Sequence, residues 1–117
     1  MKFRIIIDKE KEEEIIARVH KKTHLIDEIE AFYIEDGKTY ASYADQKKYL
    51  VKMHLYELEA ILPNHFRKIN KSNIANMKHI VRFRTSLNGD VDAEFKSGFS
   101  DYISRRCFAE LKRRYSL

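Results

Sequence analysis

One stretch in the middle of this chain is the strongest clue to its fold. It reads Leu62-Pro63-Asn64-His65-Phe66-Arg67-Lys68-Ile69-Asn70-Lys71-Ser72-Asn73-Ile74-Ala75-Asn76-Met77-Lys78-His79-Ile80. A segment with helical spacing stops at Pro63, because proline has no amide hydrogen to donate inside a helix. A strand-like segment begins at Ile80, so the stretch joins a short helix to a strand-rich region.

Two dipeptides outside this stretch, Asp36-Gly37 and Asn88-Gly89, predict tight β-hairpins. Both central residues of a type I′ turn need positive φ, which Asn, Asp and Gly tolerate best. The strands predicted around the two turns are 31–35, 38–43, 80–85 and 91–96. The last of these alternates apolar and charged residues, which is typical of a strand with one buried face.

The remaining elements are predicted from apolar spacing and capping residues. They are a strand at 2–7, a helix that begins after Asp8, an extended segment at 48–53, a helix at 55–62, a strand at 99–103 and a basic amphipathic helix at 105–114 with Ser104 as its cap. In the last helix we expect Phe108 and Leu111 to face inward. The fold class is therefore mainly β (α+β), a core of antiparallel sheets with short peripheral helices and an N-terminal strand-helix extension.

Length and charge favour a single basic domain. The chain has 117 residues and 44% apolar content, enough for one ordinary core. The net charge is +5, but residues 1–60 hold 11 Lys and Arg against 13 Asp and Glu, and residues 61–117 hold 12 against 5. One half thus carries the whole positive excess, as a partner with many phosphates would require.

The motifs of common enzymes and metal sites are absent from the sequence. There is no phosphate-binding glycine loop, and the three glycines are each explained by a turn. His20 and His24 are spaced for a shared metal but lack a third ligand, and we interpret Cys107 as a packing thiol. We therefore expect no catalysis, no cofactor, no metal and no small-molecule substrate.

The apolar runs are also too short for a membrane span or a signal peptide, which predicts a cytoplasmic protein.

The stretch at 62–80 resembles the signature of the LytTR family of DNA-binding domains. The positions that match are Leu62, Pro63, Phe66, Ser72, Ile74, Asn76 and Ile80. A second match is Tyr102-Ile103-Ser104-Arg105-Arg106 followed by Leu111-Lys112, which is similar to the C-terminal Ser-Arg motif of the family. A third is Ile34-Glu35-Asp36-Gly37-Lys38 with the later Leu55-Tyr56-Glu57-Leu58.

The resemblance implies that loops on an elongated β-structure, and not a recognition helix, enter successive major grooves of duplex DNA. Carried over by position, the groups that read bases are Lys38, Asn70, Lys71 and Arg106. Ser72, Ser104 and Arg105 match positions that contact or support phosphates. The residue types suit these roles, since Arg can pair with guanine and Asn with adenine.

One departure limits what can be transferred from the family. Its members often carry His or Arg where this chain has Asn70 and Lys71, so no base preference is copied. We expect Phe66, Ile74, Asn76 and Ile80 to be structural, with the Asn76 side chain bonded to backbone.

The resemblance covers residues 29–117 and leaves 1–28 as an extension. The family domain usually follows a phosphorylatable receiver, for which 28 residues leave no room, so a stand-alone transcription regulator is expected. The apolar face of Ile15, Ile16 and Val19 is a candidate surface for homodimerisation or for a membrane-protein inhibitor. The alternative left open is a non-enzymatic interaction module that binds RNA or an acidic protein.

Overall fold

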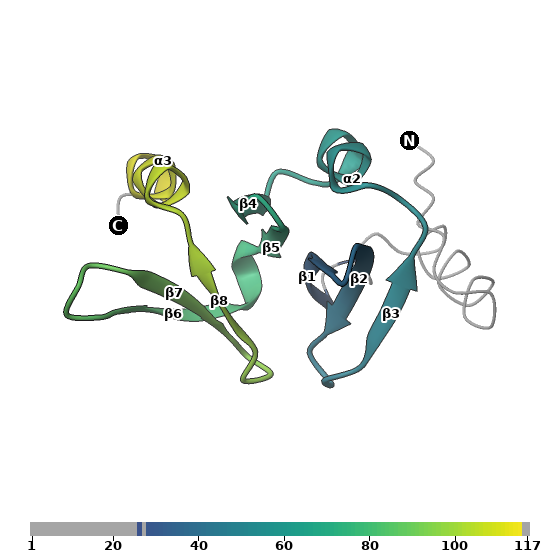
Figure 1. Cartoon of the computed structure of the whole chain (residues 1–117), viewed down its shortest axis with the longest axis horizontal. Helices are drawn as coiled ribbons and strands as arrows, with labels where there is room; N and C mark the ends of the chain where they lie inside the picture. The colour runs from purple at the N-terminus through teal and green to yellow at the C-terminus, as the bar shows by residue number, and fades with distance from the viewer. Residues whose placement is uncertain (1–25, 27, 116–117) are drawn as a thin grey trace.

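The computed structural model describes residues 26 and 28–115 (Figure 1). The predicted strand at 2–7, the predicted helix after Asp8 and the pair His20 and His24 lie outside these residues. The described part consists of two antiparallel β-sheets with two α-helices, in agreement with the predicted fold class.

The larger sheet has five strands in the order β3-β2-β1-β5-β4. Their bounds are β1 Ile29–Glu35, β2 Lys38–Tyr43, β3 Lys48–Val51, β4 Phe66–Asn70 and β5 Asn73–Asn76. The central strand, β1, is buried along its first four residues, which means that both of its faces are covered. On β2, buried residues alternate with more exposed ones, as expected of a strand with one covered face.

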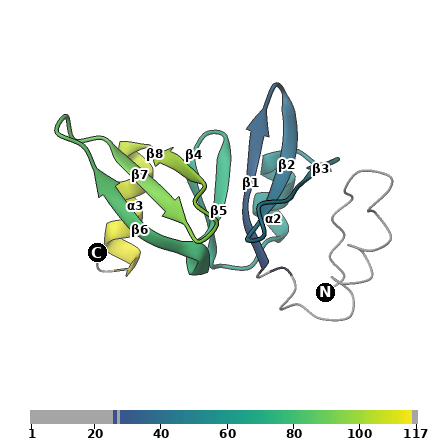
Figure 2. The ribbon, with the colours of Figure 1, turned by 90° about the horizontal axis from the view of Figure 1, so that it is seen from below.

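The smaller sheet has three strands in the order β6-β7-β8. Its strands are β6 Ile80–Thr85, β7 Val91–Phe95 and β8 Ser100–Ile103. A short 3-10 helix, η2 (Met77–His79), connects the two sheets. Both figures of the ribbon show β4 and β5 between β1 and this smaller sheet (Figures 1 and 2).

The helices cover different parts of this arrangement. Helix α2 (Leu55–Ile61) contributes Leu55 and Leu58 to a core that also contains Phe32 and Ile74 from the larger sheet. Helix α3 (Arg105–Tyr115) contributes Leu111 to a second core between the two sheets.

The second core relies on small residues from both sheets. Ala31 and Ala75 of the larger sheet and Ala93 of the smaller one are fully buried in it. Alanine leaves room for the two backbones to approach closely, and Phe95 fills the remaining space. The predicted inward direction of Leu111 is confirmed, since it is 3% exposed, while Phe108 is partly buried.

The two predicted hairpins both form, but only one has the predicted turn. Asp36 and Gly37 have φ values of 51° and 75°, so the type I′ turn is confirmed. The type I′ prediction for Asn88-Gly89 is wrong, because Gly89 has positive φ and Asn88 does not. The Gly89 amide donates to the Ser86 carbonyl at 3.0 Å, which makes a three-residue loop with glycine in the left-handed position.

The asparagine side chain explains the different turn. The Asp90 amide donates to Asn88 Oδ1 at 3.1 Å, and Asn88 Nδ2 donates to the Asp90 carboxylate at 3.0 Å. Asparagine therefore acts through its side chain and not through a left-handed backbone.

Strands β4 and β5 occupy the stretch at 62–80, where the sequence alone predicted no strands. They pair antiparallel, with Phe66 opposite Asn76 and Asn70 opposite Asn73. The expected role of Asn76 is confirmed: its side chain donates to the Ile29 carbonyl at 2.9 Å and accepts from the Lys78 amide at 3.0 Å.

A buried carboxylate links the two sheets. Glu30 on β1 is fully buried and accepts hydrogen bonds from both the amide and the hydroxyl of Ser97, in the turn between β7 and β8. The Nδ1 atom of His79 lies 3.7 Å from the same carboxylate. A buried carboxylate needs such donors, so this contact orients one sheet against the other.

Candidate nucleic-acid interface

Three of the expected DNA-binding segments are connected by hydrogen bonds across one region of the surface. The β1–β2 and β4–β5 turns point to the same side of the molecule, at the top of Figure 2. The Ile34 amide on β1 donates to the Ser72 carbonyl at 2.9 Å, and the Ser104 amide donates to the Ile69 carbonyl at 2.8 Å. The β4–β5 turn is therefore held between the first hairpin and the junction of β8 with α3.

The β4–β5 turn consists of Lys71 and Ser72, and polar side chains hold it in place. Asn70 Nδ2 donates to the Tyr102 carbonyl at 2.8 Å and to the Asp101 carboxylate at 3.2 Å. Asn70 Oδ1 accepts from the Ser72 amide at 2.8 Å. These bonds fix the position of the turn and leave the Lys71 side chain exposed.

The geometry does not place Asn70 as a group that reads bases. Its side chain is 1% exposed, and both its amide nitrogen and its oxygen have partners within the chain. Pairing with adenine would require it to leave all of these partners. In this structure Asn70 positions Lys71, and Lys71 is the group that points to solvent.

Asp101 and Asn73 complete this support, and the sequence reasoning missed both. One oxygen of Asp101 accepts from Asn70 and from Asn73 at 2.9 Å, and the other accepts from the Tyr102 amide at 2.8 Å. The only signal in the sequence was the symmetric placement of two asparagines around Lys71-Ser72, a composition that favours turns.

The junction of β8 with α3 presents two arginines. Ser104 accepts a hydrogen bond from the Cys107 amide at 3.2 Å, which confirms it as the expected cap of the helix. Arg105 and Arg106 follow in the first turn and are exposed, and this turn contains no acidic residue. Cations are unfavourable at the positive end of a helix unless an anion binds there, so their placement suits contact with phosphates or electronegative base edges.

Lys38 follows the β1–β2 turn and is exposed. The neighbouring Glu35 forms an ion pair with Lys48 at 3.2 Å, and this hydrogen bond raises the pKa of Lys48. Burial raises the pKa of Tyr33 on the same strand, β1. The carboxylate nearest to the turn on β1 is thus neutralised by Lys48, and Lys38 forms no ion pair with a described residue.

Most of the expected site residues are brought together, in different roles. The contact of β4 with β8 is surrounded by Lys71, Ser72, Ser104, Arg105 and Arg106. Lys38 lies on the neighbouring β1–β2 hairpin. Among the described residues, no group of three His, Cys, Asp or Glu side chains is placed to hold a metal ion. What the arrangement offers is a set of exposed cations on rigid supports.

The profile of the LytTr DNA-binding domain matches residues 20–116. This chain belongs to the LytTr DNA-binding domain family. The match includes every described element, and the three segments that carry the exposed cations fall within the three motifs of the sequence.

Related proteins are described as transcriptional regulators. An uncharacterized HTH-type transcriptional regulator of Staphylococcus aureus strain NCTC 8325 is 30% identical over 111 residues, which cover 94% of this chain and 76% of the relative. A regulator with the same description from the bovine strain RF122 is 30% identical over 112 residues, with the same coverage. In this LytTr chain, α2 and α3 are separated by five strands, so the described residues contain no helix-turn-helix unit.

A solved structure supports the fold. A LytTr DNA-binding domain from Bacillus cereus superimposes with a TM-score of 0.70 at 20% identity, covering 78% of this chain and 84% of that one. The two antiparallel sheets and their flanking helices are therefore the LytTr fold.

Proposed function

We propose that this chain binds duplex DNA at specific sequences and regulates transcription, through its turns and not through an inserted helix. The observation that carries the proposal is that exposed cations lie on three segments that backbone hydrogen bonds join to one another. Lys38, Lys71, Arg105 and Arg106 form no ion pairs among the described residues. Unpaired cations on a rigid surface suit the regular spacing of phosphates and base edges.

The proposed roles follow from which side chains are exposed and from which backbone positions are held by hydrogen bonds. Lys71 and Arg106 are the groups for base edges, because both are exposed and the Asn70 and Ser104 contacts support their backbones. The phosphates that flank these bases are contacted by Arg105, Ser72 and Ser104. Lys38 adds a contact from the first hairpin, and Asn70 acts by positioning Lys71.

The finer parts of the proposal rest on the family resemblance. They are binding as a homodimer to repeated half-sites and insertion of the turns into the major groove. A cytoplasmic location is a further part of the proposal and rests on the short apolar runs of the sequence. In the described part of the chain, neither helix has the length or hydrophobicity of a membrane span. A dimer or a membrane-protein partner would use residues 1–28, and replacing Ile16 by Asp tests this by its effect on sedimentation and membrane recovery.

The experiment that tests the main proposal is a selection of bound duplexes from a random pool, followed by competition at several salt concentrations. Specific binding is expected to survive an excess of unrelated DNA and to weaken steeply as salt rises. Equal affinity for RNA hairpins and for the selected duplex would contradict it and favour an RNA-binding module.

A pair of arginine variants tests the positional roles. Arg106→Ala is expected to cost about 1–3 kcal/mol of binding and to relax specificity at one base position. Arg113→Ala, in the last turn of the same helix, is expected to weaken binding slightly and evenly across sequences. Binding to a panel of duplexes with single base changes distinguishes the two, and identical profiles would refute the assignment of Arg106.

A further inference from the structure

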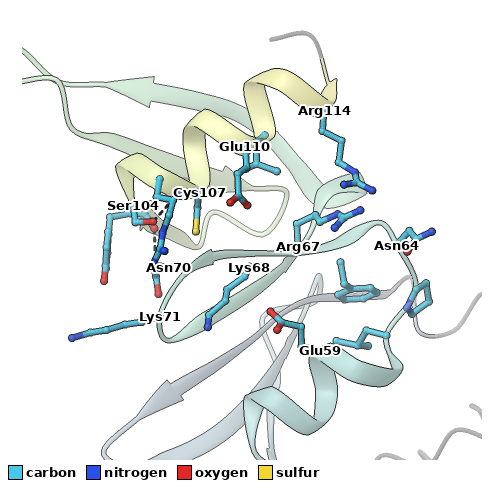
Figure 3. Close-up of a pocket in the computed structure, with 16 residues that line it drawn as sticks. Glu59, Asn64, Arg67, Lys68, Asn70, Lys71, Ser104, Cys107, Glu110 and Arg114 are labelled. Carbon is cyan, nitrogen blue, oxygen red and sulfur yellow. Dashed lines mark hydrogen bonds between the residues drawn. The ribbon is translucent and has the colours of Figure 1, made fainter.

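A hollow lies between the α2–β4 connection, the β4–β5 hairpin and α3, beside the proposed DNA surface (Figure 3). Its volume is about 510 Å³, within the range that small organic ligands occupy. Five cationic and two acidic side chains line it. Lys71 and Arg106, the proposed base contacts, are among them, so the hollow opens next to the DNA surface.

The part of the hollow that lies away from Lys71 contains two arginines that form no ion pair with a described residue. Arg67 extends from β4 and Arg114 from the last turn of α3, and their guanidinium ends point toward one another in Figure 3, near Asn64. The Nε atom of Arg67 is shielded from solvent and has no hydrogen-bond partner among the described residues. A buried donor without an acceptor is costly, so an acceptor that reaches this guanidinium group would stabilise it.

The acidic residues of the hollow do not supply this acceptor. Glu59 and Glu110 line it, but neither forms an ion pair with a described residue, and Figure 3 shows the Glu110 carboxylate apart from the two guanidinium groups. Two guanidinium groups repel one another, and an oxyanion between them removes both the repulsion and the unsatisfied donor.

Part of the remaining wall is apolar, although polar side chains such as Asn70 and Ser104 also line it. Leu62, Pro63, Phe66, Cys107 and Leu111 line the same hollow. A ligand that fits both parts carries one oxyanion for the arginines and a hydrophobic body for this wall.

We propose that the hollow binds a small organic oxyanion, with its carboxylate or phosphate group between Arg67 and Arg114 and its apolar part against Pro63 and Phe66. The ligand regulates DNA binding, a step that rests on the proposed function, because the occupied hollow includes the side chains of Lys71 and Arg106. A bound anion there lowers the positive potential of the DNA surface and restricts these two side chains.

Binding is tested first without DNA. The full chain is titrated with benzoate, phenyl phosphate and inorganic phosphate at constant ionic strength, while the ¹H–¹⁵N signal of the Arg67 Nε–H is followed by NMR. This signal is expected to shift because the donor acquires an acceptor. The two ring-bearing probes are expected to bind more tightly than inorganic phosphate, because only they use the apolar wall. The tighter of the two ring-bearing probes identifies the oxyanion as carboxylate or phosphate.

The variants are Arg114→Gln and the matched control Arg113→Gln, which makes the same charge change one residue earlier on the same helix and does not line the hollow. Arg114→Gln is expected to weaken the tighter probe about tenfold or more, as loss of a charged hydrogen bond does. Arg113→Gln is expected to leave it nearly unchanged. Equal weakening in both variants, or no shift of the Arg67 signal with any probe, would overturn the proposal.

Regulation is tested by adding the tighter probe to the complex with a selected duplex. The probe is expected to lower duplex affinity in the wild type and in Arg113→Gln, and not in Arg114→Gln. If Arg114→Gln weakens the duplex and no probe binds, the arginines contact the DNA backbone and the ligand site is refuted, while the proposed function stands. If the probes bind but no specific duplex is found, the proposed function fails and the ligand site remains.

Discussion

Asn70 and Lys71 are neighbours in the chain, yet the structure gives them opposite environments. The side-chain amide of Asn70 is buried. It donates hydrogen bonds to the Tyr102 carbonyl and the Asp101 carboxylate and accepts one from the Ser72 amide. The ammonium group of Lys71 is exposed at the tip of the hairpin. One residue stabilises the turn, and the other is available to a partner.

This contrast predicts separable effects. Asn70→Ala is expected to lower the free energy of unfolding by about 1–3 kcal/mol, because it leaves buried partners without hydrogen bonds. Lys71→Ala is expected to change that free energy by less than about 0.5 kcal/mol and to weaken duplex binding. Urea denaturation and duplex titration measure the two quantities. An Asn70→Ala protein of normal stability with altered base preference would show that Asn70 reads bases after all.

At the scale of elements, the first turn of α3 has two roles. The serine before it caps and stabilises the helix, and the two arginines in it are proposed to contact DNA. Ser104→Ala is expected to lower the free energy of unfolding by about 1 kcal/mol, because the Cys107 amide loses its acceptor. Ser104→Asn is expected to retain the cap.

Ser104→Asp separates the two roles, because aspartate caps a helix as well as serine does but brings a negative charge to the proposed DNA surface. Its stability is expected to match that of Ser104→Asn, and its affinity for duplex DNA to be lower. Thermal melting and duplex titration provide the comparison. Equal affinities for the Asn and Asp variants would argue against phosphates near this cap.

The β1–β2 hairpin depends on a turn whose two residues both have positive φ. A Cβ atom at Gly37 would have no atom within 4 Å, so substitution is opposed only by the backbone conformation. Gly37→Ala is expected to lower the free energy of unfolding by about 1–2 kcal/mol. Gly37→Asn is expected to cost less, since asparagine tolerates this conformation. Urea denaturation checks the order, and an equal loss in both variants would count against it.

At the scale of the whole molecule, the relative position of the two sheets determines whether Lys38 and Lys71 on one sheet can act with Arg106 beside the other. The Glu30–Ser97 contact is a buried polar link between them. Its removal is therefore expected to affect stability and the spacing of the cations together.

Glu30→Ala is expected to lower the free energy of unfolding by about 1–3 kcal/mol, because the amide and the hydroxyl of Ser97 both lose their acceptor. Combining it with Ser97→Ala is expected to be non-additive, since both changes remove the same hydroxyl contact. A double-mutant cycle by urea denaturation measures this coupling. Additivity within about 0.3 kcal/mol would show that the contact does not hold the sheets together.

Local chemistry in the sequence determined the first hairpin, the α2 and α3 segments, the helix cap at Ser104 and the family itself. Asp36-Gly37, Pro63 and the apolar spacing of α3 act over a few residues, so they can be identified without knowledge of the fold. The same holds for Asn76, whose bond to the Lys78 amide is local.

Only the tertiary structure decided what the polar residues of β4 and β5 do. The partners of Asn70 and Asn73 lie about thirty residues away on Asp101 and Tyr102, and Glu30 meets Ser97 across 67 residues. No periodic pattern marks such contacts, because each depends on how the two sheets pack. For this reason the sequence alone could name the segment around Lys71 as a candidate DNA contact but could not tell which of its side chains are free to bind.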